Sequence, residues 1–287
     1  MSPSTTVEPQ VWLITGCSSG FGREIALAAR KRGDLVIATA RKIDSLKELQ
    51  ALGCEALTLD VTSDDASVKD IVAKAHAFYG RIDVLVNNAG FAAQGAVEES
   101  TSEDVQAVFE TNVFGLLRVT RAVLPYMREK RSGTIANVGS GAGYIAMSTR
   151  GIYSATKFAV AGLTQSLREE VADLGIKVTV IEPARFQTNG GAGVLTFANP
   201  IKDYEPAKKA LLQKLGGKFP LGDAAMGAQA VVDALTQSGR CEGRELPSRL
   251  PLGGGLYEFM NGTLEHAKQE LDAWVDFTNP EAFAFDS

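Results

Sequence analysis

Short apolar runs alternate with longer amphipathic stretches along most of the chain. The runs are too short for helices and rich in β-branched residues, as is typical of buried strands; they cover residues 11–15, 35–40, 56–59, 82–86, 134–138 and 177–181. Helical periodicity fills the intervals, near residues 21–32, 43–52, 64–79, 102–130 and 152–174. Because parallel strands need crossover connections, this order predicts an α/β fold with a doubly wound parallel sheet, helices on both faces and one domain over residues 1–287.

The regular alternation stops after Glu182. Residues 184–218 are loop-like and dotted with glycine, and long irregular segments of this kind often form lids over binding sites. A helix near 223–238 and a short strand around 246–250 are expected next. Residues 254–277 then predict an amphipathic helix that packs on the chain's own core, because apolar side chains recur every three or four positions; these are Leu256, Met260, Leu264, Ala267, Leu271 and Trp274.

Composition excludes several classes of protein. The chain has 45% hydrophobic and 22% charged residues, which are ordinary values for a globular protein. Its net charge is −5 and it has no long basic run, so we expect neither nucleic acid nor a membrane as partner. No apolar run reaches the length of a membrane span, and the first ten residues do not resemble a secretory signal. Three separated cysteines and two histidines favour a reducing, cytoplasmic setting without a metal centre.

A glycine-rich turn follows the first expected strand and opens the first expected helix. It reads Thr15-Gly16-Cys17-Ser18-Ser19-Gly20-Phe21-Gly22. A helix N-terminus attracts phosphate through its free N–H groups, and glycine lets the backbone approach a pyrophosphate closely. A tight turn that binds nothing is the alternative, but the strand–turn–helix context favours a nucleotide. We therefore assign a cofactor-binding role to Gly16, Ser18, Ser19, Gly20, Phe21 and Gly22.

The ends of the next strands refine the expected ligand. A carboxylate after the second strand would bind the ribose 2′-hydroxyl of NAD, whereas Arg41 stands there and suits the 2′-phosphate of NADP. An arginine at this place is otherwise an ordinary surface cation. Asp60 and Val61 follow the third strand, and Asp60 either accepts from an adenine amino group or caps the next helix. In Asn87-Asn88-Ala89-Gly90, after the fourth strand, Asn87 would brace the loop and Gly90 would admit a ribose.

A candidate catalytic group stands in the second half of the chain. Tyr153 and Lys157 are four residues apart on an expected helix, so both side chains share one face. A nearby ammonium lowers the pKa of a phenol from about 10 toward neutral pH. Ser140 ends the fifth strand, where its hydroxyl can donate to a substrate carbonyl oxygen. Asn112 lies inside the expected helix 102–130, an awkward place for asparagine.

Together these motifs resemble the short-chain dehydrogenase/reductase family. The resemblance covers roughly residues 10 to 250 and rests on Thr15-Gly16-x-x-x-Gly20-x-Gly22, Asp60, Asn87-Asn88-Ala89-Gly90, Asn112, Ser140 and Tyr153-x-x-x-Lys157. It implies a Rossmann-type sheet of about seven strands and reversible carbonyl–alcohol chemistry with a nicotinamide cofactor, here NADP(H) because Arg41 resembles the NADP-selecting position.

The resemblance also implies roles for single residues. Tyr153 would be the acid/base, and Lys157 would lower the pKa of Tyr153 and hold the nicotinamide ribose. Ser140 would orient the carbonyl, and Asn112 would anchor a water in a proton relay. The cofactor site would further include Ala89, Pro183, Phe186 and Thr188, the last near the carboxamide.

Two positions depart from the family pattern. Pro183-Ala184 replaces the usual Pro-Gly, and an alanine that required a positive φ would be strained. Gly139 replaces the common serine before Ser140, a change that we expect to be mild.

Residues 142–150 and 186–218 are expected to set specificity. Their mostly apolar side chains predict a hydrophobic carbonyl or alcohol substrate; they are Tyr144, Ile145, Met147, Phe186, Leu195 and Phe197.

Two other functions stay open: an epimerase or isomerase that recycles its cofactor, and a redox sensor that binds NADP without turnover. A sensor would need no proton donor. The family often pairs through the helices at 102–130 and 152–174, which makes a homodimer or homotetramer an open expectation.

Overall fold

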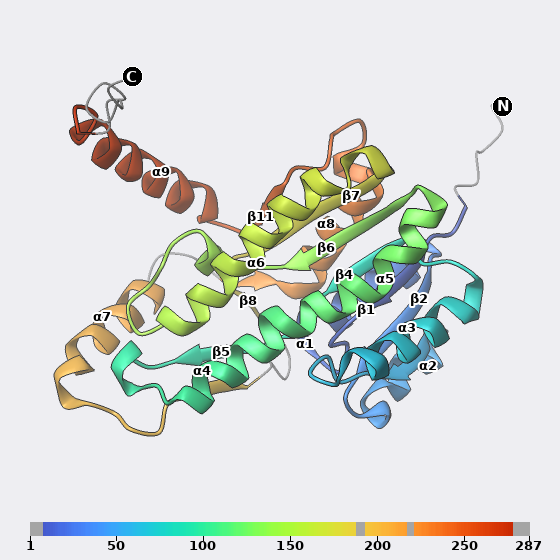
Figure 1. Ribbon diagram of the computed structural model, residues 1–287, viewed down its shortest axis with the longest axis horizontal. Coiled ribbons are helices and arrows are strands. Elements are labelled where there is room, and N and C mark those ends of the chain that lie inside the picture. The colour runs from blue at the N-terminus through green and yellow to red at the C-terminus, as the bar shows by residue number, and fades with distance from the viewer. Residues whose placement is uncertain (1–7, 188–192, 217–220, 278–287) are drawn as a thin grey trace, which may run out of the picture.

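Seven strands form one parallel sheet at the centre of the molecule (Figure 1). The computed structural model describes residues 8–187, 193–216 and 221–277. The strand order is β11-β7-β6-β4-β1-β2-β3, and each neighbouring pair is parallel. The strands are β1 (Val11–Ile14), β2 (Leu35–Ala40), β3 (Glu55–Thr58), β4 (Val84–Asn87), β6 (Gly133–Val138), β7 (Ile176–Pro183) and β11 (Arg249–Leu252). The predicted doubly wound sheet is thereby confirmed, and its order reverses between β1 and β4, where open α/β sheets bind ligands.

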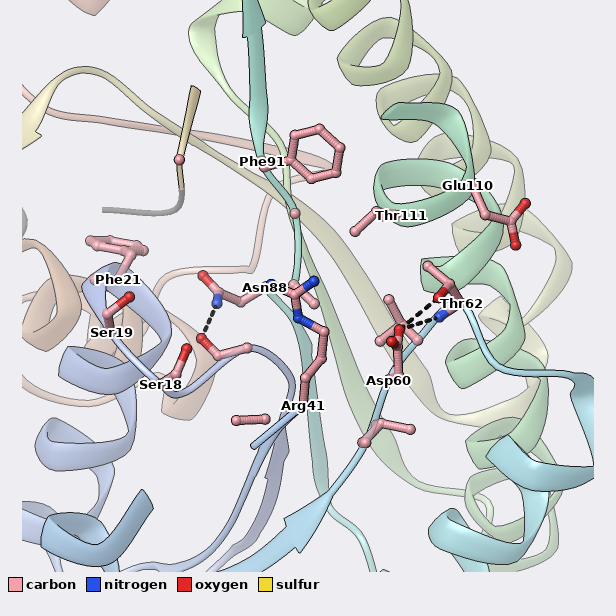
Figure 2. A pocket seen from close by; sticks show the side chains of 18 of the residues that line it. Ser18, Ser19, Phe21, Arg41, Asp60, Thr62, Asn88, Phe91, Glu110 and Thr111 are labelled. Carbon is pink, nitrogen blue, oxygen red and sulfur yellow. Dashed lines mark hydrogen bonds between the residues drawn. The ribbon is translucent and has the colours of Figure 1, made fainter. Parts of the chain in front are cut away.

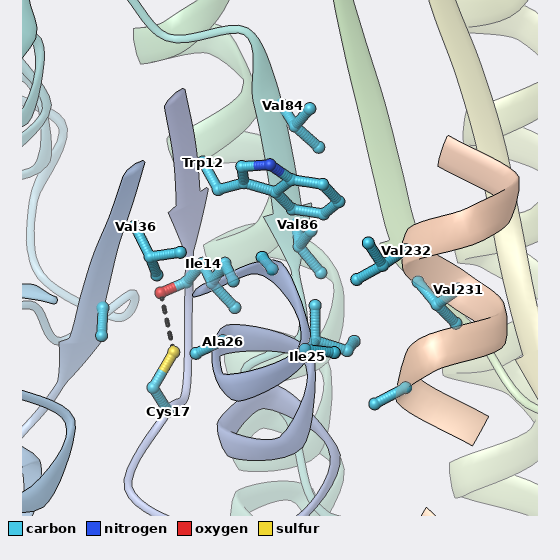
Figure 3. Close-up of a cluster of buried hydrophobic side chains, with 14 of the residues drawn as sticks. Trp12, Ile14, Cys17, Ile25, Ala26, Val36, Val84, Val86, Val231 and Val232 are labelled. Carbon is cyan, nitrogen blue, oxygen red and sulfur yellow. Dashed lines mark hydrogen bonds between the residues drawn. The ribbon is translucent and has the colours of Figure 1, made fainter. Parts of the chain in front are cut away.

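Helices cover both faces of this sheet. One face carries α1 (Gly20–Arg32), α2 (Lys47–Ala51) and α8 (Ala224–Thr236), and the other carries α3 (Asp65–Tyr79), α5 (Leu116–Lys130) and α6 (Gly151–Glu170). Strand side chains alternate between the faces. In β1, Trp12 and Ile14 pack with α1 and α8 (Figure 3), whereas Val11 and Leu13 pack with α3 and α5. This two-sided burial explains why the strands read as continuous apolar runs.

The helix expected over residues 102–130 is interrupted in its middle. α4 (Ser102–Phe109) runs through a π-helical segment, η3 (Glu110–Gly115), before α5 begins. Single π turns inside α-helices often occur at functional sites, and this one contains Asn112. The other short elements are η1 (Ile43–Leu46), β5 (Ala92–Gln94), η2 (Val97–Glu99), η4 (Gly141–Gly143), η5 (Ala172–Leu174), β8 (Phe186–Gln187), β9 (Val194–Thr196), η6 (Lys202–Tyr204), β10 (Gly222–Asp223) and η7 (Gly239–Cys241).

The segment after β7 is more regular than the sequence suggests. We name its described residues 193–216 the lid segment. It contains α7 (Glu205–Gly216), and β9 within it pairs with β5, while β8 before it pairs with β10. The expectation of a loop over 184–218 is therefore wrong for these elements. The reason is that the apolar residues of α7 form only a weakly amphipathic pattern, which the sequence alone does not distinguish from a loop.

The carboxy-terminal helix forms as expected but does not pack as expected. α9 (Leu256–Ala273) projects away from the rest of the molecule (Figure 1). Leu256 and Met260 are buried near its start, whereas Leu264, Leu271 and Trp274 are each more than half exposed. The expectation that this helix packs on the chain's own core is thus wrong beyond its first turns. None of the helices in the described ranges has the length and hydropathy needed to cross a bilayer.

Candidate active site

A cavity of about 750 Å³ lies at the carboxyl ends of β1 to β4 (Figure 2). Arg41 rises from the end of β2 into it, with Ser18 on one side and Asp60 on the other. The size is that of an ordinary small-molecule site. Predicted cofactor residues that line the cavity are Gly16, Ser18, Ser19, Gly20, Phe21, Arg41, Asp60, Val61, Ala89 and Gly90. Those that do not line it are Gly22, Asn87, Tyr153, Lys157, Pro183 and Phe186. Thr188 lies outside the described residues.

The glycine turn is tied to the end of β4. Thr15 Oγ1 accepts hydrogen bonds from Asn88 N and Ala89 N, both at 3.0 Å, and Asn88 Nδ2 donates to Thr15 O at 2.9 Å. Gly16 has φ +72°, and a Cβ there would lie 2.9 Å from Ala89 Cα. A Cβ on Gly22 would collide with the Asn88 amide. Gly22 therefore makes room for Asn88 rather than facing the cavity.

Asn87 and Asn88 differ from the sequence expectation. Asn87 is 3% exposed, and its Nδ2 donates to Thr120 Oγ1 and Asn137 Oδ1, both at 2.9 Å. Asn137 Nδ2 in turn donates to Thr164 Oγ1 at 2.9 Å, so Asn87 belongs to a buried network that joins β4 and β6 to α5 and α6. Asn88, which the sequence reasoning missed, lines the cavity instead. The signal for it was its place directly after the last strand residue.

Asp60 shapes the turn after β3. Its Oδ1 accepts from Thr62 N at 2.9 Å and Thr62 Oγ1 at 2.7 Å. The following helix α3 is capped by Asp64, whose carboxylate accepts from Ser67 N. Asp60 thus lines the cavity, and the alternative that it caps the next helix is wrong.

Tyr153, Lys157 and Ser140 lie together beyond the end of β6. Lys157 Nζ donates to Val138 O at 2.8 Å and lies 5.7 Å from the centroid of the Tyr153 ring. The Tyr153 phenol is hydrogen-bonded to the Ser140 side chain. The π segment supplies Asn112, which is 2% exposed. Tyr153, Lys157 and Ser140 do not line the cavity, but Phe91, which does, packs against the same apolar cluster as Tyr153.

The pKa values of this group reflect burial. Burial lowers the pKa of Lys157 to about 8, because an ammonium loses its hydration there. Burial also raises the pKa of Tyr153, and the Ser140 hydrogen bond and the Arg150 charge lower it in part. The Lys157 ammonium donates to Val138 O. The role expected of Lys157 in lowering the pKa of Tyr153 stays a prediction.

Asn112 joins two walls of the site. Its Oδ1 accepts from Phe91 N at 3.0 Å, and its Nδ2 donates to Phe91 O at 2.9 Å and Thr156 Oγ1 at 3.2 Å. A Cβ on Gly90 would lie 2.9 Å from Asn112 Oδ1, so Gly90 permits this contact. The side chain thereby fixes the chain after β4 against α6.

Both departures from the family pattern have local explanations. A Cβ on Gly139 would lie 2.6 Å from Val180 Cγ2, so only glycine fits between β6 and β7 there. Ala184 is not among the non-glycine residues with positive φ, and its N–H donates to Leu252 O at 2.7 Å. The strain considered for Ala184 is therefore absent. Phe186, further along, contacts Phe21, with ring centroids 5.4 Å apart.

A buried ion pair, not foreseen from the sequence, supports the turn after Ser140. Glu182 is 0% exposed and accepts from Arg249 Nε at 3.0 Å and from Arg249 Nη2. The same Nη2 donates to Gly143 O at 2.9 Å, and the guanidinium lies 4.1 Å from the Tyr144 ring centroid. A Cβ on Gly143 would lie 2.7 Å from Lys157 O, so this turn packs directly on α6. The available signal was an acidic residue at the end of an apolar strand.

A second buried carboxylate anchors the lid segment. Glu99 is 3% exposed and accepts from Ile201 N at 2.6 Å and Lys208 Nζ at 2.7 Å. These bonds, the Lys208 bond foremost, lower the pKa of Glu99 to about 2. Two residues of the lid segment, Leu195 in β9 and Phe197 just after it, belong to an apolar cluster. The cluster also contains Phe91, Ala93, Val108, Ile152 and Tyr153. Leu195 and Phe197 thus lie where a specificity role was expected.

Comparisons with known proteins agree with this arrangement. The family model described as short chain dehydrogenase matches residues 10–196. A short-chain dehydrogenase from Streptomyces avermitilis is 40% identical, with a TM-score of 0.87, over 94% of this chain and 98% of that one. A relative from Burkholderia phymatum, solved in complex with NAD, is 25% identical with a TM-score of 0.74, over 92% and 95%. ElxO, solved with NADP bound, is 26% identical with a TM-score of 0.70, over 87% and 99%.

The fold, the site and these matches define an oxidoreductase. The chain belongs to the short-chain dehydrogenase/reductase family.

Proposed function

We propose that the protein is an NADP(H)-dependent oxidoreductase that interconverts a carbonyl group and a secondary alcohol on a hydrophobic small molecule. The observation that carries this proposal is the meeting of the Tyr153 phenol with the Ser140 hydroxyl and buried Lys157, just beyond the cavity of about 750 Å³. A proton donor beside a nucleotide site is what reduction of a carbonyl requires.

The residues at the cavity fit a dinucleotide. Gly16 and Gly20 hold positive φ values of +72° and +63° at the N-terminus of α1, where backbone N–H groups suit a pyrophosphate. Ala89 and Gly90 present backbone without bulky side chains at the next strand end. We assign Pro183, Phe186 and Thr188 to the nicotinamide end, together with Tyr153 and Lys157.

Arg41 supports the choice of NADP(H). It lines the cavity at the end of β2, and the other charged residues of the lining, Asp60 and Glu110, come from other elements. An arginine here suits a 2′-phosphate, whereas an NAD site usually has an acid. ElxO was solved with NADP and the Burkholderia phymatum relative with NAD, so relatives of both kinds exist.

When bound, the nicotinamide gives or takes the hydride. Tyr153 donates its phenolic proton to the carbonyl oxygen during reduction and takes it back during oxidation. Ser140 donates a hydrogen bond to the same oxygen as negative charge grows there. Lys157, protonated below its pKa of about 8, keeps a positive charge beside both groups. Asn112 keeps Phe91 in place between the cavity and Tyr153.

Apolar residues surround Tyr153 on the substrate side. Phe91, Ile152 and Leu195 pack against the same apolar cluster as Tyr153, which supports a substrate with an apolar body. Exposed Phe114, Phe158 and Leu163 on the helices η3 and α6 support pairing of two chains through these helices as a homodimer or homotetramer.

NADPH oxidation with a panel of ketones tests the proposal. We expect turnover by the natural chain and a loss of about a thousandfold in kcat for Tyr153→Phe, with NADPH binding retained. Arg41→Ala should reduce the preference for NADPH over NADH at least about tenfold, since it removes a charge-assisted hydrogen bond. Substrate conversion without net NADPH use would identify an isomerase, and indifference to Tyr153→Phe would identify a sensor.

A further inference from the structure

Buried polar atoms without partners gather at the start of α6. Within the described residues, six buried side-chain atoms make no hydrogen bond; they are Gln10 Oε1, Asn87 Oδ1, Thr149 Oγ1, Arg150 Nε, Ser154 Oγ and Thr179 Oγ1. Three of these six lie between residues 149 and 154. Proteins pair almost all of their buried polar groups, so a concentration of unpaired ones needs an explanation, such as a bound water, ion or ligand.

Arg150 stands out in this group because it carries a charge. Its Nη2 donates to Gln94 Oε1 at 3.3 Å, a neutral acceptor, and its buried Nε has no partner. Arg150 takes part in none of the ion pairs formed within the described part of the chain. A half-buried cation without a counter-charge is unfavourable unless an anion joins it.

The position of Arg150 connects it to the reacting group. It precedes Tyr153 by three residues at the start of α6, and its positive charge lowers the pKa of the Tyr153 phenol. Thr149, directly before it, has φ +55°, an uncommon conformation for a β-branched residue, and Thr149 O accepts from Gly95 N at 2.9 Å. The backbone is thus held so that Arg150 meets β5 beside the apolar wall around Tyr153.

Arg249 shows how the Nε and Nη2 atoms of an arginine bind a carboxylate in this protein. Its Nε and Nη2 each donate to one oxygen of the Glu182 carboxylate. Arg150 presents the same two nitrogens with only the Gln94 contact on them. Paired parallel hydrogen bonds from Nε and Nη2 are the geometry that arginine uses for carboxylates.

We propose that Arg150 binds a carboxylate of the substrate, so that the compound reduced at Tyr153 is an oxo acid with an apolar chain. This inference rests on the proposed function and specifies its substrate class. The carboxylate lies against Arg150 Nε and Nη2, the carbonyl oxygen lies at Tyr153 and Ser140, and the chain lies against Phe91, Ile152 and Leu195.

Matched substrates test the inference. An aliphatic oxo acid and its methyl ester have the same carbonyl and chain but differ in charge. We expect the natural chain to show a kcat/KM for the acid at least about tenfold above that for the ester, since a hydrogen bond between charged groups contributes this much. Arg150→Met should bring the acid-to-ester ratio to about one, and Arg150→Lys should give an intermediate ratio because it keeps the charge but not the paired donors.

Arg128→Met is the matched control. It removes an equal charge from an exposed position near the end of α5 and should leave the ratio unchanged. A ratio near one in the natural chain, or a ratio that survives Arg150→Met, would overturn the inference. So would an equal rise in melting temperature with free acetate and with the oxo acid, which would identify a site for free anions.

Equilibrium binding separates this inference from the proposed function. Calorimetric titration of the oxo acid into Tyr153→Phe and into Tyr153→Phe/Arg150→Met, each with NADPH present, requires no turnover. We expect the second protein to bind the acid at least about tenfold more weakly. If apolar ketones are reduced but oxo acids neither bind nor react, the inference is wrong and the function stands. If no carbonyl compound is reduced, the proposed function is wrong, and the titration still shows whether Arg150 binds the carboxylate.

Discussion

The proposed cofactor side of the site, at the ends of β1 to β4, and its proposed substrate side, around Tyr153 and the lid segment, are held together by different kinds of interaction. On the cofactor side, the ends of β1 and β4 are joined by backbone groups and the short side chains of Thr15 and Asn88. On the substrate side, long charged side chains join distant parts of the chain. Arg249 reaches Glu182 across 67 residues, and Lys208 reaches Glu99 across 109.

The two sides therefore place different requirements on the sequence. A backbone-built cradle needs small residues at fixed positions, because a single Cβ at Gly16 would meet the next strand end. A side held by ion pairs needs two residues of opposite charge, but the residues that lie between them in the sequence can change. The substrate side is therefore free to vary in shape while the cofactor side stays constant, which suits one chemistry applied to many substrates.

Breaking the Glu182 pair should have the largest effect. We expect Glu182→Gln to lower the free energy of unfolding by about 4 kcal/mol, because it leaves the Arg249 charge partly buried and unpaired. Chemical denaturation measures this. The turn after Ser140 should also lose its support, so kcat should fall while NADPH affinity stays close to that of the natural chain.

The double variant Glu182→Leu/Arg249→Met separates the effect of an unpaired charge on stability from the effect of the ion pair on the turn after Ser140. It removes both charges together and should recover most of the lost stability, since an apolar pair needs no partner. Its kcat should stay low, because Gly143 O and Tyr144 have lost the guanidinium that holds them. Recovery of kcat along with stability would show that the pair does not position the turn.

Sequence reasoning succeeded where structure is encoded locally. The strands, the glycine turn and the helix that carries Tyr153 and Lys157 all follow from patterns within a few residues, because period and turn chemistry act over that range. The same reasoning misassigned Asn87 and Asn88. Asn87 is the last residue of β4 and Asn88 follows it, and only the folded structure shows that Asn87 contacts the network of Thr120 and Asn137.

Sequence reasoning failed where contacts between residues far apart in the sequence determine the structure. Glu182 reads as an acid at a strand end, and nothing near it in the sequence indicates Arg249. Glu99 has its anchoring role only because Lys208 on α7 reaches it. The charge of Arg150 also bears on the pKa of Tyr153, an effect that the spacing of Tyr153 and Lys157 did not indicate. Pairwise contacts of this kind are tertiary, and local periodicity carries no information about them.

A substitution on the cofactor side should have the next largest effect. Gly16→Ala combines a left-handed φ of +72° with a Cβ only 2.9 Å from Ala89 Cα, and we expect it to lower the free energy of unfolding by about 3 kcal/mol. Gly80→Ala is the control, since Gly80 has φ +67° and no atom within 4 Å of the added Cβ. It should lower stability by about 1 kcal/mol, from backbone strain alone. Equal losses would mean that contact with β4 is unimportant.

The smallest effect concerns the lid segment and depends on pH. The pKa of Glu99 is lowered to about 2, so the stabilisation from its ionised form is complete above the ordinary carboxyl range and is lost as the pH falls through about 2. Lys208→Gln removes the first cause of that shift, and the pKa should rise toward its usual range. The α7 amides of the variant should then exchange hydrogen faster than those of the natural chain near pH 3.5, whereas both proteins should exchange alike at α1. Lys209→Gln, an equal charge change at an exposed neighbour on the same helix, should behave as the natural chain does. Faster exchange at α7 in both variants would show that net charge, rather than the Glu99 contact, holds the lid segment against η2.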